Sequence, residues 1–154
     1  MERNDLHKEG EYYVVLCGDL NVPSPYTGRI YERNENFHRE IARLNKMRAV
    51  YCTLGGPKLN RDGHNDKDVM QEFQSISNDD ICGLLRNIHF RYEDDKALLV
   101  GNLRFAGPKG QIAKEMFEQQ PSAARMAMRS TISYLGSRAR CQVENIITFD
   151  VVSA

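Results

Sequence analysis

The hydrophobic residues of the chain recur at two spacings, every second residue in some stretches and every third or fourth in others. Residues 11–22 are a run of β-branched and aromatic side chains, which is typical of a strand. Polar and apolar side chains alternate over residues 81–92, which together with residues 97–105 flank the acidic turn 93–96. This period of two predicts a hairpin with one apolar and one polar face. The pattern predicts strands at residues 11–22, 49–54, 69–76, 81–92, 97–105, 130–137 and 143–152.

Helical spacing is present in two other stretches. Phe37, Ile41 and Leu44 recur at intervals of three and four with charged residues between them, which predicts an amphipathic helix with one buried stripe. Ile112, Met116 and Phe117 have similar spacing. The predicted helices are residues 34–47 and 111–119, and the Ala- and Met-rich residues 121–128 predict a further helical turn.

These elements predict an α+β fold in which mostly antiparallel strands form a partial barrel with two or three packed helices. Residues 1–10 are polar and predict a flexible N-terminal arm, and residues 58–67 predict an exposed loop. No repeat, low-complexity segment or linker divides residues 11–154, which are therefore expected to form a single domain.

Composition and charge narrow the classes of partner. The 21 basic and 21 acidic residues cancel, so no global field favours nucleic acid or an anionic membrane. No apolar run is long enough for a membrane span, and the charged N-terminus does not resemble a signal peptide. We therefore expect a protein of the cytoplasm that binds neither membranes nor, strongly, nucleic acid.

The four cysteines do not predict a metal site. Cys17, Cys52, Cys82 and Cys141 lie far apart in the sequence and form no CxxC pair, whereas structural zinc usually takes its ligands in close pairs. Reduced, mostly buried thiols are the expected state, because free cysteine behaves as a small hydrophobic residue. No metal and no cofactor is predicted.

One short motif favours a different class of protein. Gly18-Asp19-Leu20-Asn21 is similar to the strand end at which metal-dependent endonuclease/exonuclease/phosphatase enzymes hold a metal through oxygen ligands. In those enzymes the motif comes late in the chain and is followed by a Ser-Asp-His triplet, which this sequence lacks. The other interpretation is that Asp19 and Asn21 end a strand and open a turn.

Several short motifs follow one another along the chain in the same order as in the head-maturation (prohead) serine proteases of tailed bacteriophages, which the sequence therefore resembles. The resemblance covers roughly residues 12–153, and its weight comes from the order and spacing of the blocks. The matching blocks are Thr27-Gly28-Arg29-Ile30-Tyr31-Glu32, Cys52-Thr53-Leu54-Gly55-Gly56-Pro57, residues 88–103, Gly110-Gln111-Ile112-Ala113-Lys114, residues 130–137, and Ile147-Thr148-Phe149-Asp150-Val151-Val152.

The resemblance implies a catalytic histidine at a position that has no side chain here. A serine hydroxyl needs an adjacent base, and the family takes that base from a His before a Pro in a Gly-Glu-Leu-x-His-Pro-like block. The matching position is Gly56, which precedes Pro57, and the glutamate of the same block matches Thr53. The sequence therefore predicts that the family's base is missing.

The nucleophile block, Ser-Ser-Arg-Gly-x-Gly in many relatives, also departs from the pattern. If Leu135-Gly136 are kept in register, Thr131 or Ile132 falls on the nucleophile. A shifted register makes Ser133, or less naturally Ser130, the serine.

Four histidines are the alternative sources of a base. If the protein is active, His64 in the loop after Pro57 or His89 on the hairpin would be the relocated base, with His38 as a further choice and His7 a remote one. Asp150 would then orient the base. An exposed histidine is more commonly a polar surface residue, and an aspartate at a strand end more commonly caps a turn or pairs with an arginine.

The leading hypothesis is a bacteriophage virion structural or assembly protein, a pseudoenzyme with a prohead-protease-like fold. It would be present in the host cytoplasm during assembly and then in the virion, as part of an oligomer or larger assembly with capsid, scaffold or tail subunits. The first alternative is an active head-maturation serine protease that cleaves scaffold or capsid proteins. The second alternative is the metal-dependent nuclease-like enzyme.

Overall fold

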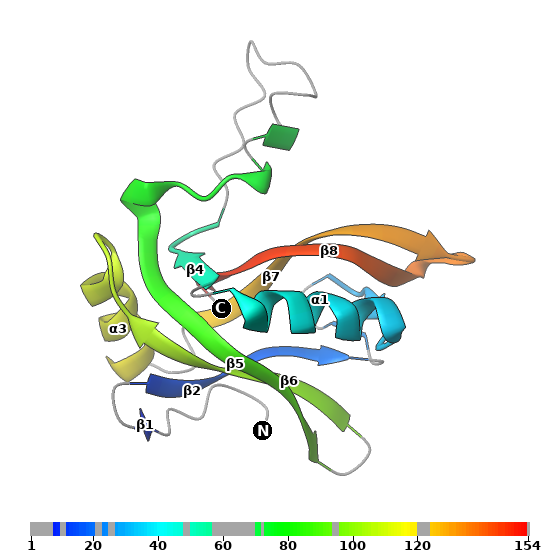
Figure 1. Cartoon of the computed structure of the whole chain (residues 1–154), viewed down its shortest axis with the longest axis horizontal. Coiled ribbons are helices and arrows are strands. Elements are labelled where there is room, and N and C mark those ends of the chain that lie inside the picture. The colour runs from blue at the N-terminus through cyan, green and yellow to red at the C-terminus, as the bar shows by residue number, and fades with distance from the viewer. Residues whose placement is uncertain are drawn as a thin grey trace.

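A computed structural model gives the fold (Figure 1). It describes residues 8–9, 12–20, 23–24, 27–47, 50–56, 70–71, 73–93, 96–119 and 124–153. Two mostly antiparallel sheets and two helices make up this part of the chain, so the predicted α+β class is confirmed. No helix in these ranges is both long enough and apolar enough to cross a membrane.

The larger sheet has five strands in the order β1-β2-β6-β5-β4, with antiparallel neighbours throughout. The predicted strand at 11–22 and the predicted hairpin at 81–105 form its centre, because their alternating side chains leave one apolar face for the core. The strands are β1 (Lys8–Glu9), β2 (Tyr12–Leu20), β4 (Val50–Thr53), β5 (Ile81–Glu93) and β6 (Lys96–Phe105).

The smaller sheet has the order β3-β8-β7. Strands β7 (Ala124–Leu135) and β8 (Ser137–Ser153) form a long antiparallel hairpin, and β3 (Ile30–Tyr31) runs parallel to β8. Three register shifts interrupt the β7–β8 ladder, one of them at Tyr134–Leu135 beside the hairpin turn, and the other two are bulges of one residue. In both the extra residue belongs to β8, because Arg129–Ser130 face Thr148 and Ile146, and Thr131–Ile132 face Asn145 and Val143.

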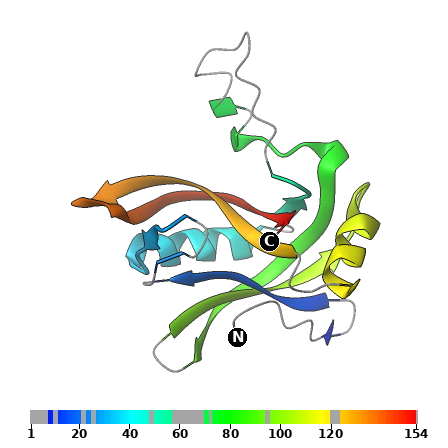
Figure 2. The same ribbon diagram turned by 180° about the vertical axis from the view of Figure 1, so that it is seen from behind.

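The two sheets meet at the end of β4. Leu54 forms a parallel bridge with Val151 of β8, and the Gly55 N–H donates to the Val151 carbonyl at 2.7 Å. On the other side, β7 lies next to β2, but no ladder joins the two strands within the described residues (Figure 2). The sheets are therefore not closed into a barrel, which is compatible with the predicted partial barrel.

Helix α1 (Glu35–Lys46) forms where the sequence predicts it. The Asn34 side chain accepts from the Phe37 N–H at 3.1 Å, so it caps the helix N-terminus. The predicted stripe faces the core: Phe37 is fully buried and Leu44 nearly so. Burying a side chain of this size contributes about 2–3 kcal/mol, which fixes the helix against β5 and β8.

Polar contacts add to this packing at the bulge of β8 that faces Arg129 and Ser130. The buried Glu40 carboxylate accepts from the Ile146 N–H at 2.8 Å, and Arg43 donates to the Ile146 carbonyl at 2.6 Å. Burial alone would raise the pKa of Glu40, but the hydrogen bonds from Arg43 and the Ile146 N–H together lower it below its usual value. Helix and bulge therefore satisfy each other's polar groups.

Another bulge explains why the alternation in β5 breaks. Asn87 has a positive φ of 52°, and the ladder to β6 shifts register between Arg86 and His89. As a result both Leu85 and Ile88 point into the core. The side chain of Asn45, on α1, bonds both the N–H of Ile88 (2.9 Å) and its carbonyl (2.8 Å), so the unpaired backbone groups of the bulge are satisfied.

Helix α3 (Gly110–Gln119) covers the end of β5 and β6 as predicted. Phe117 is fully buried and packs against Phe105, whose ring also meets Tyr13 edge-on at 5.3 Å. The Tyr13 hydroxyl donates to Glu118 at 2.6 Å and ties the helix to β2.

Two local predictions are wrong. The strand predicted at 69–76 is helical at residues 70–71 and 73–74, and the helical turn predicted at 121–128 is strand from Ala124 onward. Both segments are only eight residues long, which is too short for the hydrophobic period to distinguish strand from helix. The predicted loop at 58–67 lies outside the described residues, and so do residues 1–7 and 10 of the predicted arm.

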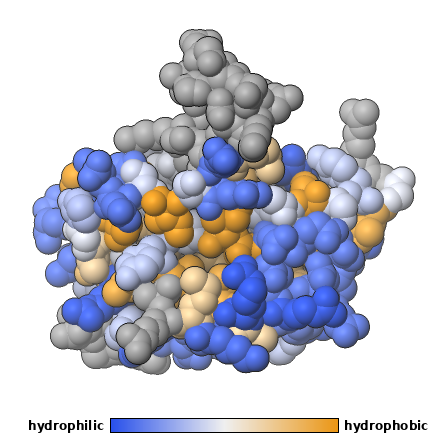
Figure 3. Space-filling model, turned by 45° about the horizontal axis from the view of Figure 1, so that its top comes forward, coloured by the Kyte–Doolittle hydropathy of each residue, from blue (hydrophilic) through white to orange (hydrophobic). Residues whose placement is uncertain are grey.

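The surface combines hydrophilic and apolar areas, in keeping with the balanced charge of the sequence. Figure 3 shows one face, on which an apolar area near the middle is bordered by hydrophilic side chains. All four cysteines are free and buried, as predicted.

Candidate functional site

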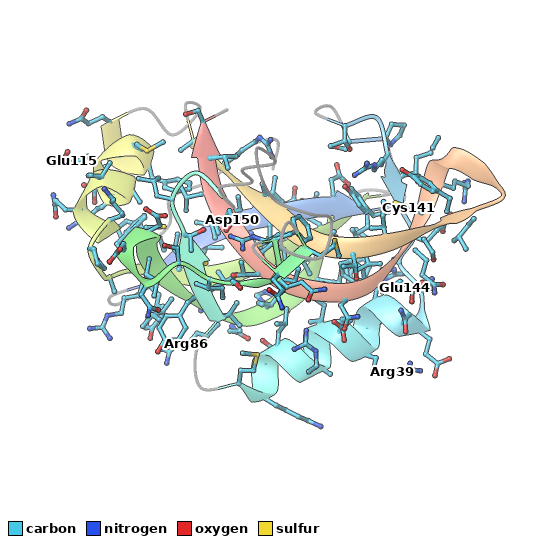
Figure 4. All side chains as sticks on the ribbon, turned by 90° about the horizontal axis from the view of Figure 1, so that it is seen from above. Arg39, Arg86, Glu115, Cys141, Glu144 and Asp150 are labelled. Carbon is cyan, nitrogen blue, oxygen red and sulfur yellow. The ribbon has the colours of Figure 1, made fainter. Side chains whose placement is uncertain are left out.

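A buried polar cluster lies where the two sheets join. Its three side chains are Arg129 on β7, Asp150 on β8 and Thr53 on β4. The side chains of Arg129 and Asp150 are 2% and 4% exposed, and the Thr53 residue is 1% exposed. Figure 4 shows Asp150 in the interior, near the C-terminal end of β8.

The Asp150 carboxylate accepts three hydrogen bonds within the cluster. Arg129 donates to it twice, from Nε to Oδ2 at 2.9 Å and from Nη2 to Oδ1 at 2.7 Å. The Thr53 hydroxyl donates to Oδ1 at 2.7 Å. A two-pronged arginine–carboxylate pair of this kind is the strong form of a charge-assisted hydrogen bond.

Every N–H group of the Arg129 guanidinium donates a hydrogen bond. Its Nη2 also donates to the Thr53 hydroxyl oxygen at 3.0 Å, and its Nη1 donates to the carbonyls of Phe73 and Ser75 at 3.2 and 2.6 Å. All five N–H donors of the side chain are therefore used. The cluster joins three strands and the segment that precedes β5 at one point.

Gly56 lies beside this cluster, just after β4. A Cβ atom placed on Gly56 would be 3.5 Å from Oδ2 of Asp150, and Gly56 is buried. The structure therefore brings together the position that matches the family histidine and the aspartate predicted to orient a base. Gly56 has φ +74°, a left-handed conformation that side-chain-bearing residues rarely adopt.

The predicted nucleophiles are not at this cluster. Asp150 lies directly opposite Ala127 in the ladder, and Ser133 is six residues further along β7, roughly 20 Å at about 3.3 Å per residue. The Ser130 side chain points to the opposite face of the sheet from Arg129, because neighbouring residues of a strand alternate. Neither serine is brought next to Asp150 or Gly56.

Ser133 has a carboxylate partner instead. Its hydroxyl donates to Oε1 of Glu144 at 2.5 Å, and Gln142 donates to the same oxygen at 3.2 Å. Glu144 is exposed and lies further along β8 from Asp150, towards the hairpin turn (Figure 4).

The two described histidines are engaged elsewhere. His89, on β5, has Nδ1 2.7 Å from the carbonyl of Asn87, and His38, on α1, packs against the ring of Phe90 at 5.0 Å. Neither imidazole is hydrogen-bonded to a serine in the part of the chain that the structure describes. His64 and His7 lie outside the described residues.

The thiols next to the cluster are poor nucleophiles. Burial, and after it the nearby negative charge of Asp150, raises the pKa of Cys82 to about 12. The pKa of Cys52 is raised well above its usual value, first by burial and then by nearby ionisable groups that include Asp150. A thiol must ionise to react, so neither replaces a serine.

The aspartate of the short Gly-Asp-x-Asn motif is the last residue but one of β2 and is half-buried. Asp19 lies in β2 opposite Leu98 of β6, and Asn21 is outside the described residues. Within the described ranges, no group of three or more His, Cys, Asp or Glu side chains could hold a metal ion. No observation supports the nuclease alternative.

Fold and motif order together indicate a phage prohead protease-like protein. The chain belongs to the Peptidase S80 family, whose family model matches residues 3–154. No significant match was found among curated proteins or solved structures. The suspected family relationship is therefore confirmed over the whole chain.

Arg129 is the site residue that the sequence did not reveal. The family pattern contains an arginine in its Ser-Ser-Arg-Gly block, and the sequence interpretation matched that block to residues 130–137 with its register left open. The buried position of Arg129, next to Asp150, supports a different register in which Ala127-Met128-Arg129-Ser130 is the matching block. Arg129 falls between the helical turn predicted at 121–128 and the strand predicted at 130–137, so the sequence pattern placed it in no element and did not mark it as buried.

Proposed function

We propose that this protein is a non-catalytic member of its family that acts as a structural or assembly component of a bacteriophage virion. The observation that carries the proposal is Gly56 beside Asp150. A side chain at this position would contact the aspartate, yet glycine supplies no imidazole to take a proton from a serine.

The state of Asp150 supports the same conclusion. An aspartate that orients a catalytic histidine must accept a hydrogen bond from that imidazole. Here Arg129 and Thr53 already donate to both carboxylate oxygens, and the charge of Asp150 is balanced inside the protein. An aspartate whose charge is already balanced by an arginine is less able to stabilise the imidazolium that a base at position 56 would become on taking a proton.

The absence of a serine at the β7 position opposite Asp150 is a further support. With Arg129 in the place of the family arginine, Ala127 and Met128 occupy the two serine positions. Ala127 is directly opposite Asp150 and on the same face, so it is the β7 residue from which a nucleophile would reach position 56. Its methyl group cannot attack a peptide bond.

If the protein has no catalytic activity, its function depends on surfaces that bind other proteins. The proposed partners are capsid, scaffold or tail subunits, met in the host cytoplasm during assembly and retained in the virion. The near-zero net charge supports such close packing, because it removes long-range repulsion between subunits.

Labelling with a fluorophosphonate serine probe tests the proposal. We expect the wild-type protein to incorporate no more probe than its Ser133→Ala and Ser130→Ala variants. In infected cells the protein should remain full length and copurify with particles at fixed stoichiometry. Probe incorporation that disappears in one serine variant, or cleavage of a scaffold or capsid protein that the same variant abolishes, would disprove a non-catalytic role.

The second candidate is an active serine endopeptidase with Ser133 as the nucleophile. The observation in its favour is the 2.5 Å contact between the Ser133 hydroxyl and Glu144, which makes this carboxylate the available proton acceptor. In that case Glu144→Gln should remove probe labelling as completely as Ser133→Ala does, whereas Asp150 variants should act through stability alone.

A further inference from the structure

The outer edge of β7 is unpaired towards the hairpin tip. Along residues 130–135, β7 pairs with β8 on one side only, and the described residues form no backbone hydrogen bond to its other side. Figures 1 and 2 show this end of the β7–β8 hairpin projecting from the body of the protein. Unpaired N–H and C=O groups on such an edge are a template for another strand.

This edge lacks the features that usually prevent strand addition. The sequence from Ser130 to Leu135, Ser-Thr-Ile-Ser-Tyr-Leu, contains no charged residue and no proline. All three register shifts of the ladder leave the extra residues on β8, so the residues of β7 follow one another without an insertion.

Two large apolar side chains are exposed on the same segment. Tyr134 is 53% exposed and Leu135 is 41% exposed. Ile132 lies on the same face as Tyr134 and packs partly against the core, so the two continue the apolar face of the sheet beyond the body of the domain.

We propose that a second copy of this chain pairs with this edge in an antiparallel manner about a two-fold axis at Ser133. In this register Ile132 of each copy lies opposite Tyr134 of the other, a β-branched–aromatic pair of the kind that stabilises antiparallel strands. The two three-stranded sheets then form one continuous sheet of six strands. The self-complementary contact closes as a dimer.

The charges around the edge permit this pairing. The nearest acidic side chain on the neighbouring strand is Glu144, which the Ser133 hydroxyl contacts. Across the dimer the two Glu144 strands are separated by three strand spacings, about 14 Å. This separation exceeds the Debye length of about 8 Å at physiological salt, so their repulsion is largely screened. The net charge of the chain is zero, so the two copies do not repel each other through their overall charge.

Sedimentation velocity on the full chain, from low concentration to about 100 µM, tests for the dimer. The wild type should dimerise, and Tyr134→Lys should raise the dissociation constant at least about tenfold by placing a charge opposite Ile132. Ile112→Lys, on α3, is the matched control because Ile112 is also an exposed apolar residue at 47%, and it should leave the constant unchanged.

Disulfide formation at the axis tests the register. Ser133→Cys should form a covalent dimer on mild oxidation, because two residues opposite each other at a two-fold axis lie within disulfide range. The wild type should form none, since its four cysteines are buried. A wild type that stays monomeric to about 100 µM overturns the proposal. A dimer that tolerates Tyr134→Lys and gives no Ser133→Cys cross-link overturns it as well.

Discussion

The two ends of the β7–β8 hairpin contain two polar clusters of opposite character. At the inner end, Arg129 and Asp150 are almost fully buried and every donor of the arginine has an acceptor. At the outer end, Ser133 and Glu144 make one short contact in solvent. The inner cluster lies beside Gly56 and joins three strands at one point. The outer cluster has the hydroxyl and the carboxylate, but water competes for both.

The comparison shows that burial, and not the kind of side chain, separates the two clusters. Burial makes each hydrogen bond of the inner cluster costly to remove, because a group left behind has no water to replace its partner. The same change at the outer cluster leaves the partner solvated. Substitutions at the two ends should therefore differ strongly in their effect on stability.

The largest effect is expected for Arg129→Met. Removing the guanidinium leaves Asp150 buried without a counter-charge and frees the carbonyls of Phe73 and Ser75. We expect the free energy of unfolding to fall by about 3–5 kcal/mol, measured by urea denaturation. Arg129→Met combined with Asp150→Leu is the control and should recover much of the loss. If the single variant is nearly as stable as the wild type, the cluster is not a structural joint.

Thr53→Val should have the next largest effect. The substitution keeps the shape of the side chain but removes the hydroxyl that donates to Asp150 and accepts from Arg129. A loss of about 2 kcal/mol in unfolding free energy is expected. Thr27→Val, in an exposed position, is the matched control and should change stability by less than about 0.5 kcal/mol. Equal effects at both threonines would argue against the importance of burial.

Glu40 connects α1 to β8 at Ile146 and should make stability depend on pH. Its pKa is lowered in the folded state, so its contribution is present above the unfolded-state value of about 4.3 and is lost as pH falls through the folded value. We expect Glu40→Gln to lower the unfolding free energy by roughly 1.5 kcal/mol at neutral pH. The difference from wild type should shrink below about pH 4. A difference that stays constant down to pH 3 would contradict the assignment.

Ser133→Ala should have the smallest effect, although the hydrogen bond it removes is short. Both groups are accessible to solvent, so the change in unfolding free energy should lie within about 0.5 kcal/mol. Thermal unfolding of the two proteins side by side would show this as nearly coincident transitions. A cost close to that of Thr53→Val would mean that the outer pair is more shielded than its exposure indicates.

Much of the architecture follows from local pattern. The apolar spacing of Phe37, Ile41 and Leu44 predicts α1, and the alternation in β5 and β6 predicts their hairpin, because side chains of period 3.6 or 2 can be buried on one face in only one way. The two failures, at 69–76 and 121–128, are short segments in which contacts distant in sequence decide between helix and strand.

The residues of the candidate site, too, could be identified only partly from the sequence. Gly56 and Asp150 could be identified from the sequence because each belongs to an ordered family block, and a missing side chain is visible in the letters themselves. Arg129 could not, because its partners are 21 and 76 positions away and only the meeting of β4, β7 and β8 brings them to one point. The sequence by itself determined that position 56 carries no side chain and so cannot supply a base. The tertiary structure alone decided what Asp150 binds instead, since a buried charge takes whichever partner the packing of distant strands supplies.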